Sequence, residues 1–313
     1  MSPRRLRHED YKVGWICALP YPELTAAMFM LDEEHETLPC DGDTNNYTMG
    51  MIAHHNVVLA SLPIGEYGTS SAANVATNME RSFKIEIGMM VGIGGGVPQL
   101  GHDIRLGDVV VSTPGIGNGG VVQYDYGKAK ENGEFEPTGW LNATPIKLRT
   151  AIGTVKAREG FRSNEFAQYL AAFHGDEGQK FAYPGCKEDR LYEVNEVDKE
   201  VERTDRANLN PVVHYGTIAS GNALIKDGVL RDKLAKKHKT LCFEMEAAGL
   251  MNHFPCTVIR GICDYADSHK NNQWQPYAAA TASAYAKHLL NHIPPLQASN
   301  TGPAVSAEGR LTL

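Results

Sequence analysis

Residues 87–98, "IGMMVGIGGGVP", join an uninterrupted apolar run to a glycine-rich end. Such a run is typical of a strand that is buried on both faces of a parallel sheet. The glycines allow a tight turn, and they also let the backbone come close to a bound molecule. The dinucleotide fingerprint is absent, because the sixth position counted from Gly92 is Val97, and no Gly-Lys-Ser/Thr follows. A structural turn and a ligand-contacting loop are therefore equally good interpretations of these glycines.

Apolar, β-branched runs recur along the chain and alternate with alanine-rich segments. They predict strands at Val13–Ala18, Val57–Leu62, Ile87–Val91, Asp108–Ser112, His214–Ala219, Thr240–Phe243 and Thr257–Ile262. Helices are predicted near Glu23–Leu31, Ser70–Phe83, Ile146–Arg158, Lys226–Lys237, Glu246–Asn252 and Tyr277–Asn291. This alternation indicates an α/β fold with a mostly parallel sheet that helices cover on both faces.

The folded domain is expected to span residues 10–293 as a single unit. Residues 1–9 are charged, and we expect a flexible N-terminus there. Residues 294–313 have the composition of a disordered tail. Residues 178–211 are polar and charged and do not fit the alternation. We therefore predict an insertion beside the sheet that could serve as a lid or flap.

The composition narrows the function classes. The 313 residues carry a formal net charge of −7, which argues against nucleic acid or an anionic membrane as a partner. The apolar run from Val13 to Leu19 is shorter than we expect of a signal peptide, and we expect no membrane span. The six cysteines show no zinc-type spacing, and neither a metal nor another cofactor is predicted. Four of them lie in apolar runs, which favours buried free thiols and a cytoplasmic location.

Functional groups are expected where the strands end, because ligands of an open parallel sheet bind beyond the carboxyl ends of its strands. Glu23 follows the first predicted strand, and Asp264 follows the last. The stretches "GIGGG" (92–96), "SGNALIKDG" (220–228) and "FEMEAAG" (243–249) follow other strands. We therefore predict a site at this edge of the sheet.

The acids of this set each have a structural alternative. Glu246 stands where a strand gives way to a predicted helix, whose amides would keep its carboxylate ionised and able to hold a vicinal diol. It could instead be a helix acid paired with Arg260. Asp264 could act as an acid if burial favoured its protonated form, or it could be a turn residue. Glu244 is either a supporting acid that faces Arg260 or a structural one.

Four blocks, "GIGGG", "SGNALI", "FEMEAAG" and "RGICDYAD", follow one another in this order. In this combination the chain resembles the nucleoside phosphorylase/nucleosidase superfamily. "VGWICALP", "DIRLGDVVVS" and "HYGTIASGN" are similar to blocks of fungal purine nucleosidase domains in receptor-like proteins of the NLR type. The resemblance covers roughly residues 10 to 293. It implies a central mixed sheet wrapped by helices, and a homo-oligomer, either a dimer or a trimer of dimers.

The resemblance implies a role for each acid and its partners. Asp264 would give a proton or a hydrogen bond to N7 of a purine. Glu246 and Met245 would bind the ribose, with the carboxylate on the 2′- and 3′-hydroxyls. Arg260 would order the acids around it.

Backbone and apolar contacts follow from the same resemblance. Gly94 and Gly95 would lie against the sugar and the base. Leu224 and Ile225 would cover the purine and offer it backbone hydrogen bonds. Nucleosidases of the family often carry an aromatic here, so Leu224 implies weaker stacking or a different base preference.

Glu23 decides the reaction class. The resemblance implies that a glutamate after the first strand activates the attacking water, whereas phosphorylases place basic groups there to hold phosphate. The usual spacing "ALPxE" has one extra residue here, "ALPYPE" (18–23). The expected activity is hydrolysis of the N-glycosidic bond of purine nucleosides or nucleotides. The alternatives are a phosphate-dependent purine nucleoside phosphorylase and a non-catalytic nucleotide-sensing module.

The base and the 5′ substituent are less constrained. Asp264 is compatible with 6-aminopurines, whereas some members that prefer 6-oxopurines carry Asn there, so adenine is the expected base. Related domains act on adenine nucleotides such as ATP. Arg105, Lys226 and Arg231 are therefore candidate phosphate contacts, although each is more often a solvated surface charge.

Two further features remain open. Tyr124, Tyr126 and Lys128 form either a loop that reaches a neighbouring subunit's site or a plain surface loop. Cys263 with His269 has the residue types of a nucleophile and its base, but no local signature of a cysteine enzyme surrounds them.

Overall fold

The computed structural model describes residues 4–99, 101–131, 135–162, 164–196, 198–254 and 256–296. Its strands are β1 Val13–Cys17, β2 Glu33–Glu34, β3 Thr48–Ile52, β4 His55–Ser61, β5 Ile87–Gly96, β6 Val109–Ser112, β7 Val121–Gln123, β8 Gly127–Ala129, β9 Phe135–Pro137, β10 Val213–Ser220, β11 Thr240–Glu244 and β12 Cys256–Asp264. Its helices are α1 Thr25–Phe29, α2 Thr69–Ser82, α3 Ile146–Glu159, α4 Gly228–His238 and α5 Gln275–Asn291. Segments of 3-10 or π geometry lie at His8–Asp10, Pro20–Leu24, Glu165–Phe173, Gln179–Phe181, Cys186–Glu188 and Ala247–Gly249. Every predicted strand is present, and the α/β class is confirmed.

Most strands form one mixed sheet in the order β11-β10-β6-β12-β5-β1-β4-β3-β2. β1, β4, β5 and β12 run parallel to one another, as the apolar runs predict. β11 pairs in parallel with β10 and also antiparallel with the end of β5. The strands from β5 through β12, β6 and β10 to β11 thus close on themselves. This closure brings the carboxyl ends of β5, β11 and β12 to one place.

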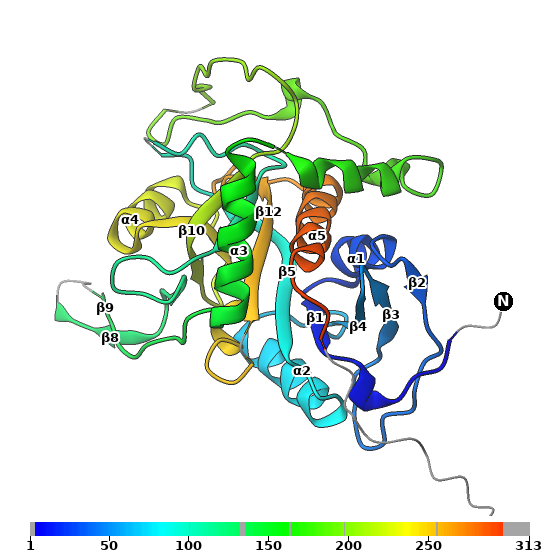
Figure 1. The fold of residues 1–313 in the computed structure, drawn as a ribbon. Helices are drawn as coiled ribbons and strands as arrows, with labels where there is room; N and C mark the ends of the chain where they lie inside the picture. Colours follow the sequence, from blue (N-terminus) through cyan, green and yellow to red (C-terminus); the bar gives the residue numbers. More distant parts are fainter. Residues whose placement is uncertain are drawn as a thin grey trace, which may run out of the picture.

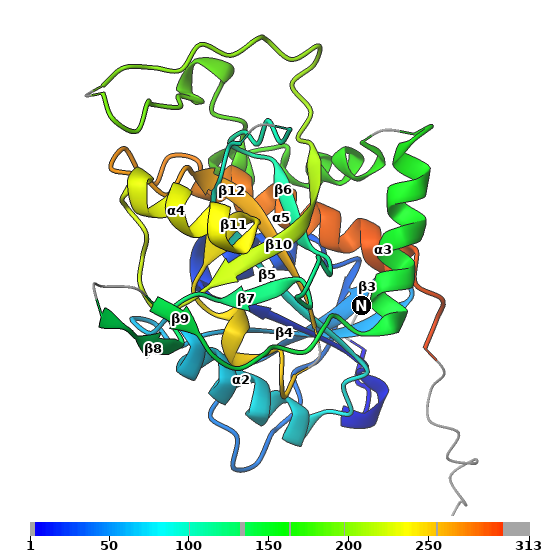
Figure 2. The same ribbon diagram turned by 90° about the vertical axis from the view of Figure 1, so that its left-hand side faces the viewer.

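Helices cover both faces of the sheet. Along β4, Val57 and Leu59 pack into a core with α1, α3 and α5, whereas Val58 and Ala60 pack on the other side with α2. This alternation follows from the two-residue period of a strand. In Figure 2, α2 lies below the strands. Within the described residues, no helix combines the length and apolar character that a membrane crossing needs.

The polar segment 178–211 runs beside the sheet as an extended loop (Figure 1, green, top). Its described part contains two short 3-10 segments and an isolated bridge between Tyr192 and Glu200. Arg206 donates two hydrogen bonds to the buried carboxylate of Asp108 at the start of β6. The segment's status as an insertion stays a prediction, as do the boundaries of the domain.

Parts of both predicted termini lie outside the described residues. These are residues 1–3 of the expected flexible N-terminus and residues 297–313 of the expected tail. Within the described part, Arg4 forms a bridge with His35.

Several element predictions were wrong in detail. The helix predicted over Glu246–Asn252 is a single 3-10 turn followed by irregular turns. The turn packs tightly against α2, because a Cβ on Gly249 would lie 2.0 Å from the Thr69 carbonyl oxygen at the start of that helix. The helix predicted from Glu23 begins only at Thr25, after the π segment. β2, β3, β7, β8 and β9 were not predicted; they are short, and β3 carries a glycine at its centre.

Candidate active site

A cavity of about 460 Å³ opens at the carboxyl ends of β1, β5, β11 and β12. The predicted site residues that line it are Glu23, Gly94, Gly95, Leu224, Ile225, Lys226, Met245, Glu246, Arg260 and Asp264. The convergence expected from the strand ends is therefore present. Of the predicted site residues, Arg105 and Arg231 do not line the cavity.

The glycines of β5 are required by the close approach of neighbouring groups. A Cβ on Gly92 would lie 2.3 Å from Oε1 of Glu23, and a Cβ on Gly95 would lie 2.9 Å from Oδ1 of Asp264. A Cβ on Gly94 would lie 3.0 Å from the Phe243 carbonyl oxygen in β11. Any larger residue would push the acids or the strands apart. The glycines of "GIGGG" thus let the acids lie directly against the backbone of β5.

Glu23 is buried and held by backbone amides. Its Oε2 accepts hydrogen bonds from the N–H groups of Ala18 (2.6 Å) and Leu19 (2.9 Å), and its Oε1 accepts one from Ile93 (2.8 Å). Burial raises the pKa of Glu23, while Arg260, with Nη1 at 3.9 Å from Oε1, and the amides oppose that rise. A carboxylate with a raised pKa is a stronger base than an exposed one.

Arg260 lies at the centre of three carboxylates. Its Nη2 contacts Glu244, and it lies 3.4 Å from Oε2 of Glu246. Burial alone would lower the pKa of Arg260, but Glu244, Glu246 and Glu23 outweigh it and raise the pKa. We call these four residues the acid cluster. Because it holds three acids and one guanidinium, this end of the cavity favours positive charge.

The backbone amides at the end of β11 go to Glu244 rather than to Glu246. Oε2 of Glu244 accepts the N–H groups of Glu246 (3.1 Å) and Ala247 (3.0 Å). Glu244 thus accepts the free amides of the 3-10 turn and faces Arg260. Its role as a supporting acid stays a prediction. The idea that a helix start keeps Glu246 ionised was wrong.

Glu246 instead accepts longer bonds. The N–H of Gly68, next to α2, donates to its Oε1 at 3.3 Å, and the N–H of Met245 donates to its Oε2 at 3.3 Å. Burial, assisted by Glu244 and Glu23 and opposed by Arg260, raises the pKa of Glu246 to about 7. Its carboxylate thus has fewer strong donors than those of Glu23 and Glu244, and it lines the cavity.

Asp264 ends β12 with its carboxylate buried. Oδ1 accepts the N–H of Ala266 at 2.8 Å, and the thiol of Cys263 donates to Oδ2 at 3.1 Å. Oδ2 also forms an ion pair with Nζ of Lys270, which lines the cavity. Lys270 was not predicted from the sequence. The sequence shows only a lysine that stands six positions after an acid at a strand end.

The opposite wall of the cavity is apolar. It is lined by Leu224, Ile225, Phe243 and Ala266, with Tyr67 nearby at the rim. Leu224 is exposed by 52%, whereas Ile225 and Phe243 are buried. The hydroxyl of Tyr124 donates to the carbonyl of Ala223, and its ring packs edge-on against Phe243. Tyr124 therefore supports the loop that forms this wall.

The remaining predicted residues have other partners. The guanidinium of Arg105 bonds Asp103 at 2.8 Å and the Thr204 carbonyl, in a different cavity beside the polar segment. Arg231 is buried and donates to the Tyr265 carbonyl at 2.9 Å.

The cysteine hypothesis loses support. Burial raises the pKa of Cys263 well above its usual value, which disfavours the thiolate. His269 stacks on Tyr192 and contacts Asp198 instead. All six cysteines are unpaired and four are buried, as the apolar runs predict.

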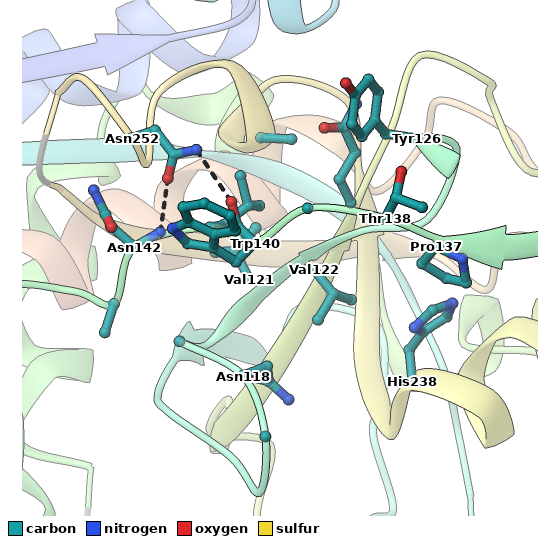
Figure 3. Close-up of a pocket in the computed structure, with 17 residues that line it drawn as sticks. Asn118, Val121, Val122, Tyr126, Pro137, Thr138, Trp140, Asn142, His238 and Asn252 are labelled. Atoms are coloured by element: carbon teal, nitrogen blue, oxygen red, sulfur yellow. Dashed lines mark hydrogen bonds between the residues drawn. The ribbon is translucent and has the colours of Figure 1, made fainter. Parts of the chain in front are cut away.

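A larger cavity of about 880 Å³ lies between the β7 region and the turn after β11 (Figure 3). Asn252 lies on one side of it, where its side chain accepts the N–H of Asn142 at 2.8 Å and donates to the Trp140 carbonyl at 3.1 Å. Tyr126 lines this cavity and is exposed. Lys128, in β8, is exposed as well. None of its described lining residues is an acid. The smaller cavity therefore remains the candidate active site.

One group of residues has the ligand types of a metal site. The ligand atoms of Glu165, His288 and His292 lie within 4.8 Å of one another, outside the candidate active site. Arg158 and Arg162 approach the carboxylate of Glu165 to 3.3 Å and 3.5 Å. Their positive charge disfavours a cation at this position.

Comparison with known proteins agrees with the geometry. The chain matches the family model "Phosphorylase superfamily" over residues 12–291. It is 50% identical over 303 residues to a nucleotide-binding leucine-rich repeat (NLR)-like protein of Hyaloscypha variabilis, a match that covers 93% of this chain and 30% of that protein. It is 26% identical over 231 residues to the "ATP nucleosidase Cap17" of Escherichia coli, covering 72% of this chain and 40% of that protein.

The fold has solved counterparts. The structure of futalosine hydrolase from Helicobacter pylori superposes with a TM-score of 0.60 at 18% identity, covering 90% of this chain and 98% of that one. The chain spans less than half the length of the two curated relatives it matches. The family model covers most of the sequence, and the glycines of β5 and the acid cluster lie within the matched residues. The chain therefore belongs to the phosphorylase superfamily.

Proposed function

We propose that the protein hydrolyses the N-glycosidic bond of purine nucleosides or nucleotides. The observation that carries this proposal is the division of the cavity between the acid cluster and the Asp264–Lys270 pair. Cleavage of the bond leaves positive charge on the sugar and negative charge on the base. The acid cluster favours the first, and the Lys270 ammonium paired with Asp264 compensates the second.

Each acid has a separate part in this reaction. Glu246 binds the ribose hydroxyls, and Glu23 accepts a proton from the attacking water. The bond between C1′ and N9 breaks, and its electron pair leaves with the purine. The proton that N7 gains comes through the Asp264–Lys270 pair. One water is consumed; the proton taken by Glu23 returns to solvent, and the Asp264–Lys270 pair regains a proton from solvent.

Water is the preferred nucleophile because the acid cluster would repel phosphate. Glu23 and Glu246 face the same end of the cavity, and the single cation there, Arg260, is already paired with acids. A phosphate dianion placed beside them would meet unfavourable charge in a medium of low dielectric constant. Phosphorolysis is therefore the second candidate. A non-catalytic nucleotide sensor ranks third, since a sensor needs no buried base at Glu23.

The preferred base is adenine, and the substrate class includes ATP. The acid at Asp264 is compatible with a 6-aminopurine, and a relative is named an ATP nucleosidase. Lys226 is exposed at the rim of the cavity, where a 5′-phosphate chain could contact it. Arg105 and Arg231 are weaker candidates because they are engaged elsewhere. We propose a cytoplasmic location, in line with the buried thiols, and a homo-oligomer, as the family resemblance implies.

Product chromatography tests the function. Purified protein is incubated with adenosine, inosine, guanosine, AMP and ATP, each with and without inorganic phosphate. Hydrolysis gives free base with ribose, or with ribose carrying only the substrate's own phosphates. A strict requirement for inorganic phosphate, with ribose 1-phosphate as product, would establish the phosphorylase alternative. Binding of adenosine or ATP without release of adenine would establish the sensor.

A further inference from the structure

Lys270 is the cation that faces Asp264 inside the cavity. Its Nζ pairs with Oδ2 of Asp264, and only 16% of the lysine side chain and 3% of the aspartate side chain are exposed. Burial opposes the charge of Lys270, but the neighbouring Cys263 and Asp264 raise its pKa. The lysine therefore carries a positive charge at neutral pH.

Without this cation, Asp264 would work against the reaction. The purine becomes negatively charged as the C1′–N9 bond breaks, and a lone carboxylate beside it would repel it. With Lys270 in place the pair is neutral overall and holds an exchangeable proton. Lys270 holds Oδ2 of Asp264, and the N–H of Ala266 donates to Oδ1. Together these two contacts fix the plane of the carboxylate.

The loop that carries Lys270 is held by the polar segment. The hydroxyl of Tyr265 donates to Oδ1 of Asp189 at 2.5 Å and accepts from Arg203 at 2.8 Å. The ring of His269 stacks on Tyr192 with 3.7 Å between ring centroids and 13° between planes.

Further contacts restrain the same loop. Nε2 of His269 lies 3.0 Å from Oδ1 of Asp198, a second contact from the polar segment. On the other side, Arg231 donates to the Tyr265 carbonyl and lies 3.8 Å from Oδ2 of Asp267. Residues on both sides of Lys270's loop thus limit where its ammonium can lie.

We propose that Lys270 is the positioning residue for Asp264 and that four residues of the polar segment, Asp189, Tyr192, Asp198 and Arg203, hold the lysine's loop in place. This inference rests on the proposed function for its kinetic readout. It assigns to the polar segment the role of a structural clamp on the base end of the site. It also predicts that the lysine acts on every substrate equally, because its partner is the enzyme's own carboxylate.

The kinetic test compares Lys270→Met, Lys270→Arg and the exposed Lys236→Met as a matched control. We expect Lys270→Met to lower kcat about 30-fold or more with adenosine and ATP alike, with KM changed only a few-fold. Lys270→Arg should recover part of the rate, and Lys236→Met should behave as wild type. A loss confined to ATP and expressed in KM would make Lys270 a phosphate contact and overturn the proposal.

A second readout does not depend on activity. Lys270→Met leaves the buried carboxylate of Asp264 without its cation, so the melting temperature should fall. Adding Asp264→Asn should remove most of this fall. If wild-type protein releases no purine but this coupling is present, the proposed function fails while the pairing stands. Equal falls in both backgrounds would contradict the pairing.

The clamp has its own variant. Tyr192→Ala removes the stack on His269, and we expect kcat to fall several-fold. In the Lys270→Met background the same change should have no further effect, because the residue it positions is gone. Additive losses in the double variant would show that the polar segment acts by another route.

Discussion

The two ends of the candidate site are built differently. The acid cluster stands on strand ends and the π segment, with every member at most 6% exposed. At the other end, Asp264 also stands on a strand, but its partner Lys270 lies on a loop that the polar segment holds. The sheet thus supplies fixed negative charge for the sugar, while a loop supplies the cation for the base. The difference suggests that the sugar end determines the chemistry and the base end can be adjusted.

Removing one acid from each end should give the largest effects. We expect Asp264→Asn and Glu23→Gln each to lower kcat about 1000-fold, because each loses a proton-transfer group. KM should change only a few-fold, since neither group carries most of the binding. Steady-state assays of adenine release provide the measurement. Near-normal turnover of Glu23→Gln would show that the extra residue in "ALPYPE" shifts the base to another position.

Glu246→Gln should have a smaller effect that appears in both parameters. An amide loses the charged acceptor for the ribose hydroxyls, and a hydrogen bond to a charged group contributes about 1.5–3 kcal/mol. We therefore expect kcat/KM to fall roughly 100-fold, with KM raised. The matched control is a 2′,3′-dideoxynucleoside, on which wild type and variant should be nearly equal. An unchanged affinity for the natural substrate would count against the ribose role.

Much of this site could be predicted from sequence because strand ends converge. Glu23, Glu246 and Asp264 each follow an apolar run, and the topology of a parallel sheet brings such positions together. The closing contact between β11 and β5 could not be predicted, since it depends on long-range register. It explains why Gly94 and Gly95 lie so close to Phe243, whereas the pairing of β12 with β5 brings Asp264 to Gly95.

The parts that sequence missed depend on loops and on local geometry. Lys270 lies in "DYADSHK", where no periodicity fixes the direction of a side chain. Only its pairing with a buried acid distinguishes it from a surface lysine. Glu244 and Glu246 are two residues apart in sequence. Their roles separate because the 3-10 turn directs the free amides to Glu244.

The pH dependence of kcat/KM should report on Glu246 of the acid cluster. The pKa of Glu246 is raised to about 7 from a usual 4.5. Below pH 7 the carboxylate is protonated and holds the ribose less well, so kcat/KM should fall about tenfold per pH unit toward acid. Glu246→Gln should lack this limb of the profile.

Stability should change in the opposite direction. Because the pKa of Glu246 is higher in the folded state, the native protein binds more protons than the unfolded chain between about pH 4.5 and 7. The contribution of Glu246 to the free energy of unfolding is therefore greatest at the acid end and is lost as pH rises through 7. Denaturant unfolding of wild type and Glu246→Gln at pH 5 and pH 8 measures it. A variant whose difference from wild type is the same at both pH values would contradict the raised pKa.

The smallest effect is expected at the wall of the base end, where no charge is involved. Leu224 is half exposed at the rim and lines the same apolar wall of the cavity as Phe243. Leu224→Phe adds an aromatic surface for the purine, and aromatic pairs contribute about 0.5–1.5 kcal/mol beyond burial. We expect KM for adenosine to fall about three- to tenfold with kcat unchanged. Leu209→Phe, at an exposed position of the polar segment, should have no effect. A raised KM would mean that the side chain at 224 limits space, and that the base end, unlike the acid cluster, is adjusted by shape rather than by charge.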